Sequence, residues 1–230
     1  MNRTRIEYCD WTWNPATGCL HGCEYCYARR LAKRLRGRFG YPKDYPFRPT
    51  FHPDRLVEPY RLKKPSKIFV VDMGDLFGEW VPDIWIEKIL KVVEDNSRHT
   101  SQFLTKNPKR MYGWLFPENA WLGATINNQQ MVELAYDLSL SDMSVRVVRN
   151  QKRIKFISFE PFLEDITIDL SEIDWVIVGA QTNPYRPPKR EWVEHIIEQA
   201  RESDIPIFLK DNLRWDEVIR QYPTVEGDRD

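Results

Sequence analysis

Residues 67–105 read KIFVVDMGDLFGEWVPDIWIEKILKVVEDNSRHTSQFLT, and this stretch contains the pattern that decides the fold. It begins with the apolar run Lys67–Asp72 and ends with Ser101–Thr105. Neither run alternates polar with apolar residues, which is typical of parallel strands buried on both faces. Between the two runs, apolar residues recur at the spacing of one helix face: Ile86, Ile89, Leu90 and Val93. A strand, a helix and a second parallel strand predict an α/β protein.

The same alternation continues along the rest of the chain. Further strands are predicted at Glu7–Trp13, Ala120–Ile126, Ile154–Phe159, Asp174–Gly179 and Ile205–Leu209. Helical spacing recurs twice, at Met131, Leu134, Ala135 and Leu138 and again at Val193, Ile196, Ile197 and Ala200. Because these are seven strands rather than eight, the sequence predicts an incomplete, TIM-like barrel of six or seven parallel strands with outer helices. We expect one domain over residues 1–230.

Composition and charge exclude several other classes of protein. The 230 residues are 42% hydrophobic and 30% charged, with 34 basic and 34 acidic residues. No apolar run approaches the roughly 18 residues of a membrane span, and the polar, basic N-terminus does not resemble a signal peptide. The motifs GxGxxG, GxxxxGK[ST], GxSxG and HExxH are absent from the sequence. The expectation is a cytoplasmic protein without a membrane partner, whose binding sites are local.

A proline-rich segment interrupts the regular pattern at residues 41–65. It contains six of the 16 prolines, interleaved with aromatic residues: Tyr41, Tyr45, Phe47, Phe51 and Tyr60. No helix fits this spacing, so we expect an ordered, irregular insertion. It would serve either as a lid or binding arm, or as a strap that packs its aromatic residues over one end of the barrel. Residues 226–230 are expected to form a frayed tail.

Three of the four cysteines lie within eight residues, at Cys19, Cys23 and Cys26, and Cys9 lies upstream. Such clustering favours a metal or redox site in a reducing compartment over a disulfide framework. A zinc site would need His21 or Cys9 as its fourth ligand. A redox pair of Cys23 and Cys26 would leave Cys19 without a role. A [4Fe–4S] cluster held by the three thiolates leaves one iron open to a small molecule.

Polar residues follow almost every predicted strand. They are Asp72 and Asp75; Thr105, Lys106 and Asn107; Thr125 and Asn127; Glu160; Gln181, Thr182 and Asn183; and Lys210, Asp211 and Asn212. In α/β folds, ligands bind at the carboxyl ends of the strands. Each residue taken singly also suits a turn or a helix cap. The cysteine loop follows the first strand, so it would share the same rim.

Residues 14–29, NPATGCLHGCEYCYAR, resemble the cysteine loop of the radical S-adenosylmethionine (SAM) enzymes, and in particular of the branch similar to spore photoproduct lyase. Other segments resemble a phage-associated, uncharacterised branch of the same superfamily: Met73–Phe77, Phe103–Pro108, Trp121–Thr125, Phe159–Pro161 and Asp174–Gly179. Together the similarity runs from about residue 6 to residue 212.

The resemblance implies a cofactor and roles for the site residues. Cys19, Cys23 and Cys26 would ligate a [4Fe–4S] cluster whose fourth iron binds the amino and carboxylate groups of SAM. An electron from a flavodoxin- or ferredoxin-type donor would then cleave SAM, and the 5′-deoxyadenosyl radical would abstract a hydrogen atom from the substrate. Such an enzyme acts as a lyase, a transferase or an oxidoreductase. The implied cofactor-binding residues are Tyr25, against the adenine, together with Asp75, Thr125, Asn127 and Glu160.

The sequence departs from the family pattern at two places. Met73-Gly74-Asp75 stands where the superfamily has Gly-Gly-Glu, so Asp75 would replace that glutamate at the cofactor's amino group. Residues 179–182, GAQT, stand where the phage-associated branch has Gly-Gly-Glu-Ser, so a carboxylate is lost there. The loop also keeps the compact spacing of the superfamily between its first two cysteines, whereas the phage-associated branch has a longer stretch.

From Arg29 to Lys43 there are seven cations and no acid, which indicates a contact with phosphates. With the aromatic residues of the insertion as stacking platforms, this pattern predicts a nucleic acid or nucleotide substrate. The alternative is a solvated helix whose Leu31, Ala32 and Leu35 face the sheet. Two other functions remain open: a metal- or Fe–S-stabilised nucleic-acid-binding module without catalysis, and a thiol oxidoreductase. Cys9 would be a core thiol or a hydrogen donor to the substrate.

Overall fold

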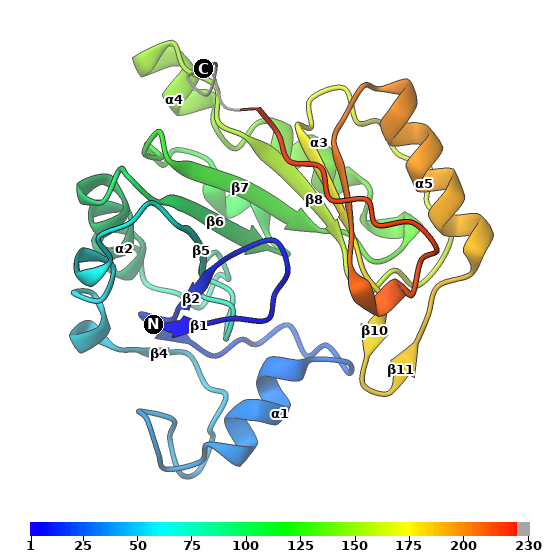
Figure 1. Cartoon of the computed structure of the whole chain (residues 1–230). Helices are drawn as coiled ribbons and strands as arrows, with labels where there is room; N and C mark the ends of the chain where they lie inside the picture. The colour runs from blue at the N-terminus through cyan, green and yellow to red at the C-terminus, as the bar shows by residue number, and fades with distance from the viewer. Residues whose placement is uncertain (225–230) are drawn as a thin grey trace.

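A mostly parallel sheet of eight strands forms the centre of the computed structural model, which describes residues 1–224 (Figure 1). From one edge to the other, the strands are β1 (Asn2–Arg3), β2 (Trp11–Trp13), β5 (Lys67–Val70), β6 (Thr100–Thr105), β7 (Ala120–Thr125), β8 (Lys155–Phe159), β9 (Trp175–Val178) and β12 (Ile207–Leu209). All seven predicted strands are present, and they pair with one another in parallel. The antiparallel edge strand β1 was not predicted, because two residues are too few to show a period.

The sheet is open, ending at β1 on one side and at β12 on the other within residues 1–224. The prediction of parallel strands is therefore confirmed, whereas no barrel closes. The first predicted strand, Glu7–Trp13, is too long: only its last three residues pair with β5. Residues 7–10 turn instead, with the amide of Cys9 donating to the carbonyl of Ile6 over 3.2 Å. This turn carries Tyr8 and Cys9 onto one face of the sheet.

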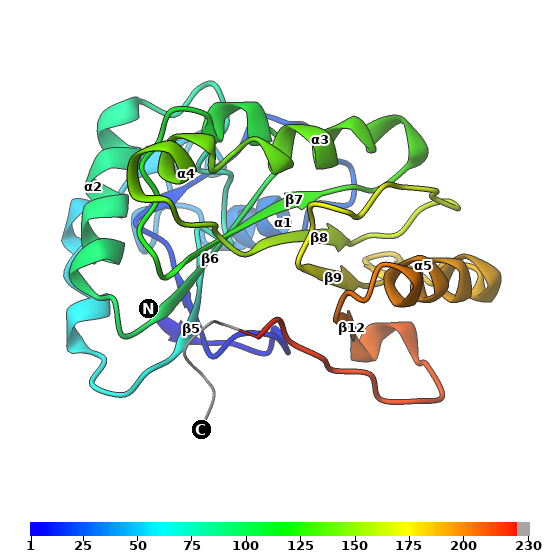
Figure 2. The ribbon, with the colours of Figure 1, turned by 90° about the horizontal axis from the view of Figure 1, so that it is seen from above.

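Helices follow most of the strands, and four of them cover one face of the sheet (Figure 2). The helices are α1 (Tyr27–Arg34), α2 (Asp83–Asp95), α3 (Glu133–Ser139), α4 (Met143–Arg149) and α5 (Arg190–Glu202), of which α2 to α5 form this layer. The predicted apolar faces of α2 and α5 are buried in the main core. No described helix has both the length and the apolar character needed to cross a membrane.

Shorter elements fill the connections. Two small antiparallel pairs form apart from the main sheet: β3 (Ala16–Thr17) pairs with β4 (Thr50–Phe51) across α1, and β10 (Gln181–Thr182) forms a hairpin with β11 (Tyr185–Arg186). Single 3₁₀ turns lie at Pro53–Arg55, Pro59–Arg61, Pro108–Met111, Gln129–Met131 and Asp211–Leu213. The connection from β8 to β9 contains no helix.

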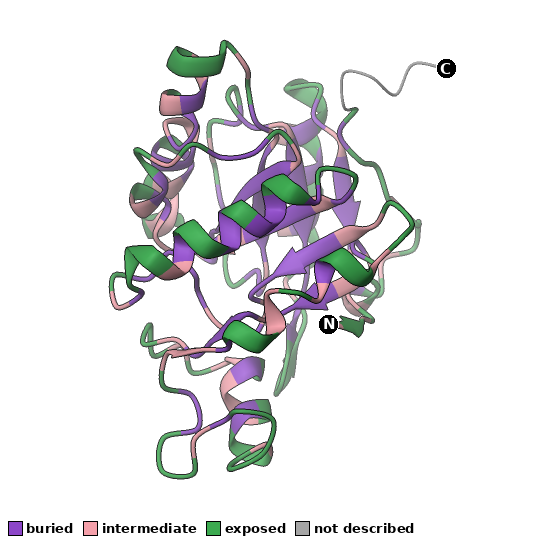
Figure 3. Ribbon diagram, turned by 90° about the vertical axis from the view of Figure 1, so that its left-hand side faces the viewer, coloured by how far each residue is buried: buried purple, intermediate pink, exposed green. Residues whose placement is uncertain are grey.

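The other face of the sheet is covered by an aromatic cluster. The chain's terminal segments run over the same face (Figure 2), and Figure 3 shows the central strands coloured as buried. The cluster contains Tyr8, Cys9, Phe69, Trp121, Phe156, Trp175, Ile177 and Phe208. The Tyr222 ring stacks on Trp175 with ring centroids 5.3 Å apart, so the C-terminal segment contributes to this cover. Because both faces are buried, the strands need no alternation of polar and apolar residues.

Helix α1 packs on the proline-rich insertion. Its buried residues Ala28 and Ala32 form a separate cluster with Tyr41, Phe47 and Met73, and Leu35 packs against that cluster. Leu31 is 39% exposed, so the expectation that it faces the sheet is wrong. The apolar side of α1 faces the insertion instead. The frayed tail predicted at 226–230 lies outside the described residues.

His52 ties the insertion to the segment that leads into the cysteine loop. Its Nε2 lies 2.9 Å from the Thr17 hydroxyl, and its backbone amide donates to the Pro15 carbonyl over 2.7 Å. The side chain is buried, and this burial together with the nearby Arg55 guanidinium lowers the pKa of His52 to about 4.

We therefore predict that the protein loses stability when the pH falls from 6.5 to about 4. In that window His52 takes up a proton in the unfolded chain but not in the folded one, so the unfolded state binds more protons. Full protonation removes about 3 kcal/mol from the free energy of unfolding. Urea unfolding at several pH values, for the wild type and for His52→Gln, measures this contribution. An equal pH dependence in both proteins would contradict it.

Candidate functional site

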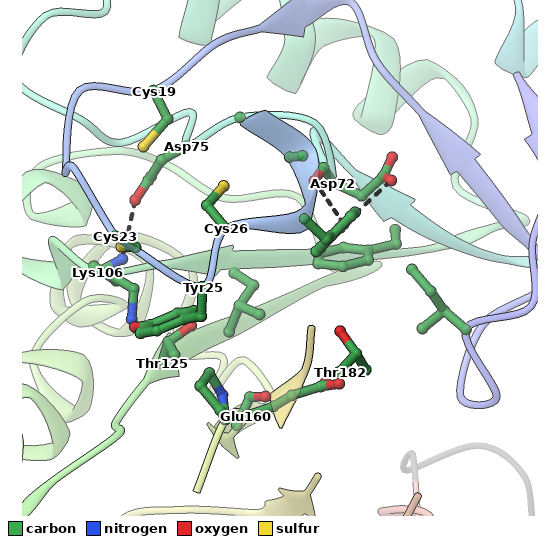
Figure 4. A pocket seen from close by; sticks show the side chains of 18 of the residues that line it. Cys19, Cys23, Tyr25, Cys26, Asp72, Asp75, Lys106, Thr125, Glu160 and Thr182 are labelled. Atoms are coloured by element: carbon green, nitrogen blue, oxygen red, sulfur yellow. Dashed lines mark hydrogen bonds between the residues drawn. The ribbon is translucent and has the colours of Figure 1, made fainter. Parts of the chain in front are cut away.

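A cavity of about 530 Å³ opens at the carboxyl ends of the parallel strands (Figure 4). The end of each strand from β5 to β12 contributes to its wall, and the cysteine loop, α1 and the N-terminal segment complete it. The residues with polar or thiol side chains in the wall are Thr4, Arg5, Tyr8, Cys19, His21, Cys23, Tyr25, Cys26, Tyr27, Asp72, Asp75, Thr105, Lys106, Thr125, Ser158, Glu160, Gln181, Thr182 and Lys210. The parallel order of the strands explains the gathering, because all their carboxyl ends meet at one rim.

The cysteine loop is fastened to the segment after β5 by a backbone contact. Gly18 and Gly74 form an isolated parallel bridge, and the Gly18 amide donates to the Met73 carbonyl over 2.9 Å. Gly18 has a φ of +93°, and a Cβ added there would lie 2.3 Å from the Arg48 carbonyl oxygen. Gly22 has a φ of +77° with open space around it. Both conformations favour glycine, but only Gly18 is also enclosed.

All three loop cysteines line the cavity as free thiols. Cys26 is the N-cap of α1, and its Sγ accepts a hydrogen bond from the Arg29 amide over 3.3 Å. Burial raises the pKa of the Cys19 thiol to about 12. Within residues 1–224, no group of three or more His, Cys, Asp or Glu side chains is arranged to hold a metal ion.

The donor set nevertheless has the chemistry of a three-thiolate cluster site. Cys19, Cys23 and Cys26 are soft ligands that share one wall of a cavity large enough for a small molecule beside them. The two candidates for a fourth protein ligand are engaged elsewhere. Cys9 lies in the aromatic cluster, on the face of the sheet opposite to helices α2 to α5, and His21 Nε2 lies 2.7 Å from Asp75 Oδ2. Three thiolates with one open position fit a [4Fe–4S] cluster better than they fit zinc.

Asp75 links the cysteine loop to the ends of two strands. Its Oδ1 accepts from the Thr105 hydroxyl over 2.7 Å and from the Phe77 amide over 3.0 Å. Its Oδ2 accepts from the Lys106 amide over 3.0 Å and contacts the His21 ring. The carboxylate lines the cavity with four polar partners, so it organises the loop whatever it does to a ligand. Its predicted contact with a cofactor stays a prediction.

Tyr25, Lys106 and Asn127 form a second network beside the cysteines. The Tyr25 hydroxyl donates to Asn127 Oδ1 over 2.6 Å, and Lys106 Nζ donates to the same oxygen. The Asn127 amide donates to the Pro161 carbonyl over 2.7 Å, so this side chain is fixed from three sides. Burial lowers the pKa of Lys106 and raises that of Tyr25. Asn127 is buried behind the wall and acts on the cavity through the other two residues.

The floor of the cavity carries two hydroxyls from neighbouring strands. Thr125 on β7 and Ser158 on β8 are register partners, and both line the cavity. The Ser158 hydroxyl is buried and has no hydrogen-bond partner among the described residues. An unpaired buried hydroxyl costs free energy, and this one lies in the cavity wall beside Thr125.

Lys210 and its acidic partners form the part of the wall farther from the cysteines. Lys210 Nζ lies 2.5 Å from Glu160 Oε1 and 3.7 Å from Glu7 Oε2. Burial opposes the charge on Lys210, but these carboxylates outweigh it and raise its pKa. The Tyr27 hydroxyl donates to the Asp72 carbonyl over 2.7 Å, and burial raises the pKa of the Asp72 carboxyl. Figure 4 shows Glu160 and Thr182 along the wall beyond the cysteines.

Seven of the eight predicted site residues line this one cavity, and the eighth, Asn127, lies directly behind it. Lys106, Ser158 and Lys210 were not chosen as site residues. Lys106 and Lys210 follow strands, as the chosen residues do, but they carry no other signal in the sequence. Ser158 lies inside an apolar strand, so only its neighbours in space show that it lines the cavity.

The fold is similar to that of spore photoproduct lyase, a radical SAM enzyme. Three structures of that lyase, each with a dinucleoside spore photoproduct and one with AdoMet as well, match 87% of this chain at TM-scores of 0.52–0.54 and sequence identities of 12–13%. The chain spans 63% of the lyase chains. It belongs to the family described as "Protein of unknown function (DUF5131)", whose model matches residues 3–228. No curated protein matches the sequence significantly.

The two glycines of the cysteine loop give a matched pair of variants. Both have positive φ, so alanine costs about 1–2 kcal/mol of backbone strain at either position. At Gly18 the new Cβ also collides with the Arg48 backbone, so we predict that Gly18→Ala destabilises the protein by more than about 3 kcal/mol and Gly22→Ala only by the strain. Urea unfolding of both variants tests this, and equal losses would show that Gly18 is not enclosed.

Proposed function

We propose that this protein is a radical SAM enzyme. The observation that carries the proposal is the placement of Cys19, Cys23 and Cys26 on one wall of the cavity at the carboxyl rim of the parallel sheet. The similarity to spore photoproduct lyase supports it at the level of the fold. On this proposal the open sheet serves as the partial barrel predicted from the sequence, and the relation to a phage-associated branch of the superfamily stays a prediction.

The three cysteines would hold a [4Fe–4S] cluster, with SAM beside it in the cavity. When bound and reduced, this pair would supply the radical chemistry needed to remove a hydrogen atom from a substrate. Tyr25, fixed by Asn127, offers its ring to an adenine, while Thr125 and Ser158 offer hydroxyls to a polar part of the cofactor.

The remaining residues of the site would position the loop and the ligands. Asp75 holds the cysteine loop against β5 and β6, and its contact with the cofactor's amino group is part of the proposal. Lys106 brings a half-buried ammonium group near the three cysteines, which suits a carboxylate ligand. Glu160, held by Lys210, places a carboxylate farther along the wall. Keeping these groups bonded in advance lowers the cost of ordering them around a ligand.

The substrate expected from the sequence is a nucleic acid or a nucleotide. Support comes from the cations between Arg29 and Lys43 and from the dinucleoside in the similar lyase structures. An external one-electron donor of the flavodoxin or ferredoxin type would supply the electron, and a reducing compartment such as the cytoplasm would keep the thiols free. Whether the reaction ends as a lyase, a transferase or an oxidoreductase reaction depends on the substrate.

Anaerobic reconstitution with iron and sulfide tests the proposal. We predict about four irons per chain, a reduced-cluster EPR signal that changes when SAM is added, and release of 5′-deoxyadenosine measured by chromatography. Serine in place of Cys19, Cys23 or Cys26 should remove the cluster and reduce 5′-deoxyadenosine to background. Cys9→Ser is the matched control, because this thiol lies in the inner aromatic cluster, and it should keep both.

Two other results would contradict the proposal. Retention of zinc that depends on Cys9 or His21 would favour a metal-stabilised binding module without catalysis. Thiol–disulfide exchange activity that survives Cys19→Ser would favour an oxidoreductase built on Cys23 and Cys26.

A further inference from the structure

Helix α1 and the loop after it carry an unpaired positive charge. Residues 29–48 contain eight cations and a single acid, Asp44, in a chain whose net charge is zero. No cation of this segment forms a salt bridge with a carboxylate within residues 1–224. Elsewhere, basic residues such as Lys91 and Arg190 face acidic partners. The positive charge is therefore concentrated on one surface, where it attracts a polyanion.

Six of the eight cations in this segment are exposed to solvent. Five exposed cations lie on α1 and in the loop to residue 43, and a sixth follows the insertion's buried aromatics: Lys33, Arg34, Arg36, Arg38, Lys43 and Arg48. The helix buries only its alanines, against Tyr41 and Phe47. Figure 1 shows α1 and this loop standing away from the sheet. We call this surface, formed by α1 and residues 35–48, the basic face.

Two aromatic side chains project from the basic face. Phe39 is 71% exposed and Tyr45 is 72% exposed, although Tyr41 and Phe47 of the same segment are buried. Phe39 also has a φ of +51°, which is unfavourable for a bulky residue, and its carbonyl accepts a bond from the Arg55 guanidinium. The fold holds this ring outward at a cost and gains no burial from it, which points to a role outside folding.

The basic face reaches the mouth of the cavity. Helix α1 begins at Tyr27, which lines the cavity, one residue after Cys26. The Arg30 guanidinium donates over 2.6 Å to the carbonyl of Asn183, in the turn between β10 and β11. Thr182, next to that turn, lines the cavity as well. A chain lying along α1 would thus be led to the cavity entrance.

We propose that the basic face binds a single-stranded nucleic acid and delivers it to the cavity. Its cations would contact the phosphates, and Phe39 and Tyr45 would stack on unpaired bases, a combination that suits single strands. A duplex keeps its bases out of reach of these rings, and an acidic protein would use the charge but leave both rings without a partner. This inference rests on the function proposed above for the chemistry, whereas binding itself needs neither cluster nor SAM.

Fluorescence anisotropy with a labelled single-stranded oligonucleotide of about 15 nucleotides, over a series of salt concentrations, tests the proposal. We expect Lys33→Glu with Arg36→Glu to weaken binding at least about 10-fold and to lower the slope of log K against log salt by about 1.4. The matched control is Lys63→Glu with Lys64→Glu. These lysines are equally exposed, but they precede β5 at the opposite end of the sheet, so binding should stay within about 2-fold.

The aromatic residues are tested separately from the charges. Phe39→Ala and Tyr45→Ala should each weaken binding by at least about 5-fold without changing the salt slope, because stacking releases no counterions. Lys33→Gln with Arg36→Gln repeats the charge test with less disturbance of α1, and it should lower the slope in the same direction. All variants should keep the wild-type circular dichroism spectrum and urea midpoint, which shows that they fold.

Three results would overturn the proposal. One is equal weakening by the Lys33/Arg36 pair and by the control pair. Another is duplex binding as tight as single-strand binding, with both alanine variants silent. In the last, the Lys33/Arg36 pair of substitutions leaves oligonucleotide binding unchanged but slows the reduction of the cluster by an acidic electron carrier. That result would assign the basic face to the carrier. Tight single-strand binding by a protein that cannot cleave SAM would leave this proposal standing and remove the one on catalysis.

Discussion

The parallel contact between Gly18 and Gly74 is the constraint on which the site depends. It extends the pairing of β2 with β5 beyond the last strand residues, and so it holds the start of the cysteine loop at the rim where all the parallel strands end. Only glycine fits at Gly18, because the Arg48 backbone occupies the space of a side chain. Once this contact forms, Cys19, Cys23 and Cys26 must lie above the ends of the strands, and the cavity has one thiol-rich wall.

Buried polar networks then fix the geometry of the two parts of the cavity. Asp75 joins the loop to β5 and β6, and Asn127 fixes Tyr25 and Lys106 beside the cysteines. Farther along the wall, Lys210 and Glu160 neutralise each other. Buried polar groups are costly unless they are bonded, so each network tolerates few alternative arrangements. Ser158, whose buried hydroxyl has no hydrogen-bond partner among the described residues, also lines the cavity.

The distribution of apolar residues explains why α1 differs from the other helices. Both faces of the sheet are already covered, one by α2 to α5 and the other by the aromatic cluster and the terminal segments. Helix α1 therefore packs on the insertion with little more than Ala28 and Ala32, and its remaining surface stays free for charge. The insertion does two things at once: Tyr41 and Phe47 support α1 from below, while Tyr45 points to solvent.

The sequence by itself determined the seven parallel strands, the apolar helix faces, the cysteine loop and the rim on which the polar residues gather. These features are encoded locally, in periodicity, in spacing and in the order of strands and helices. Only the tertiary structure decided that the sheet stays open, that Glu7–Asp10 turn away from β2 and that Leu31 is exposed. It also decided the pairings of Lys210 with Glu160 and of Arg30 with Asn183, which are far apart in the chain. Such contacts depend on which distant segments meet in space, and no local pattern records that.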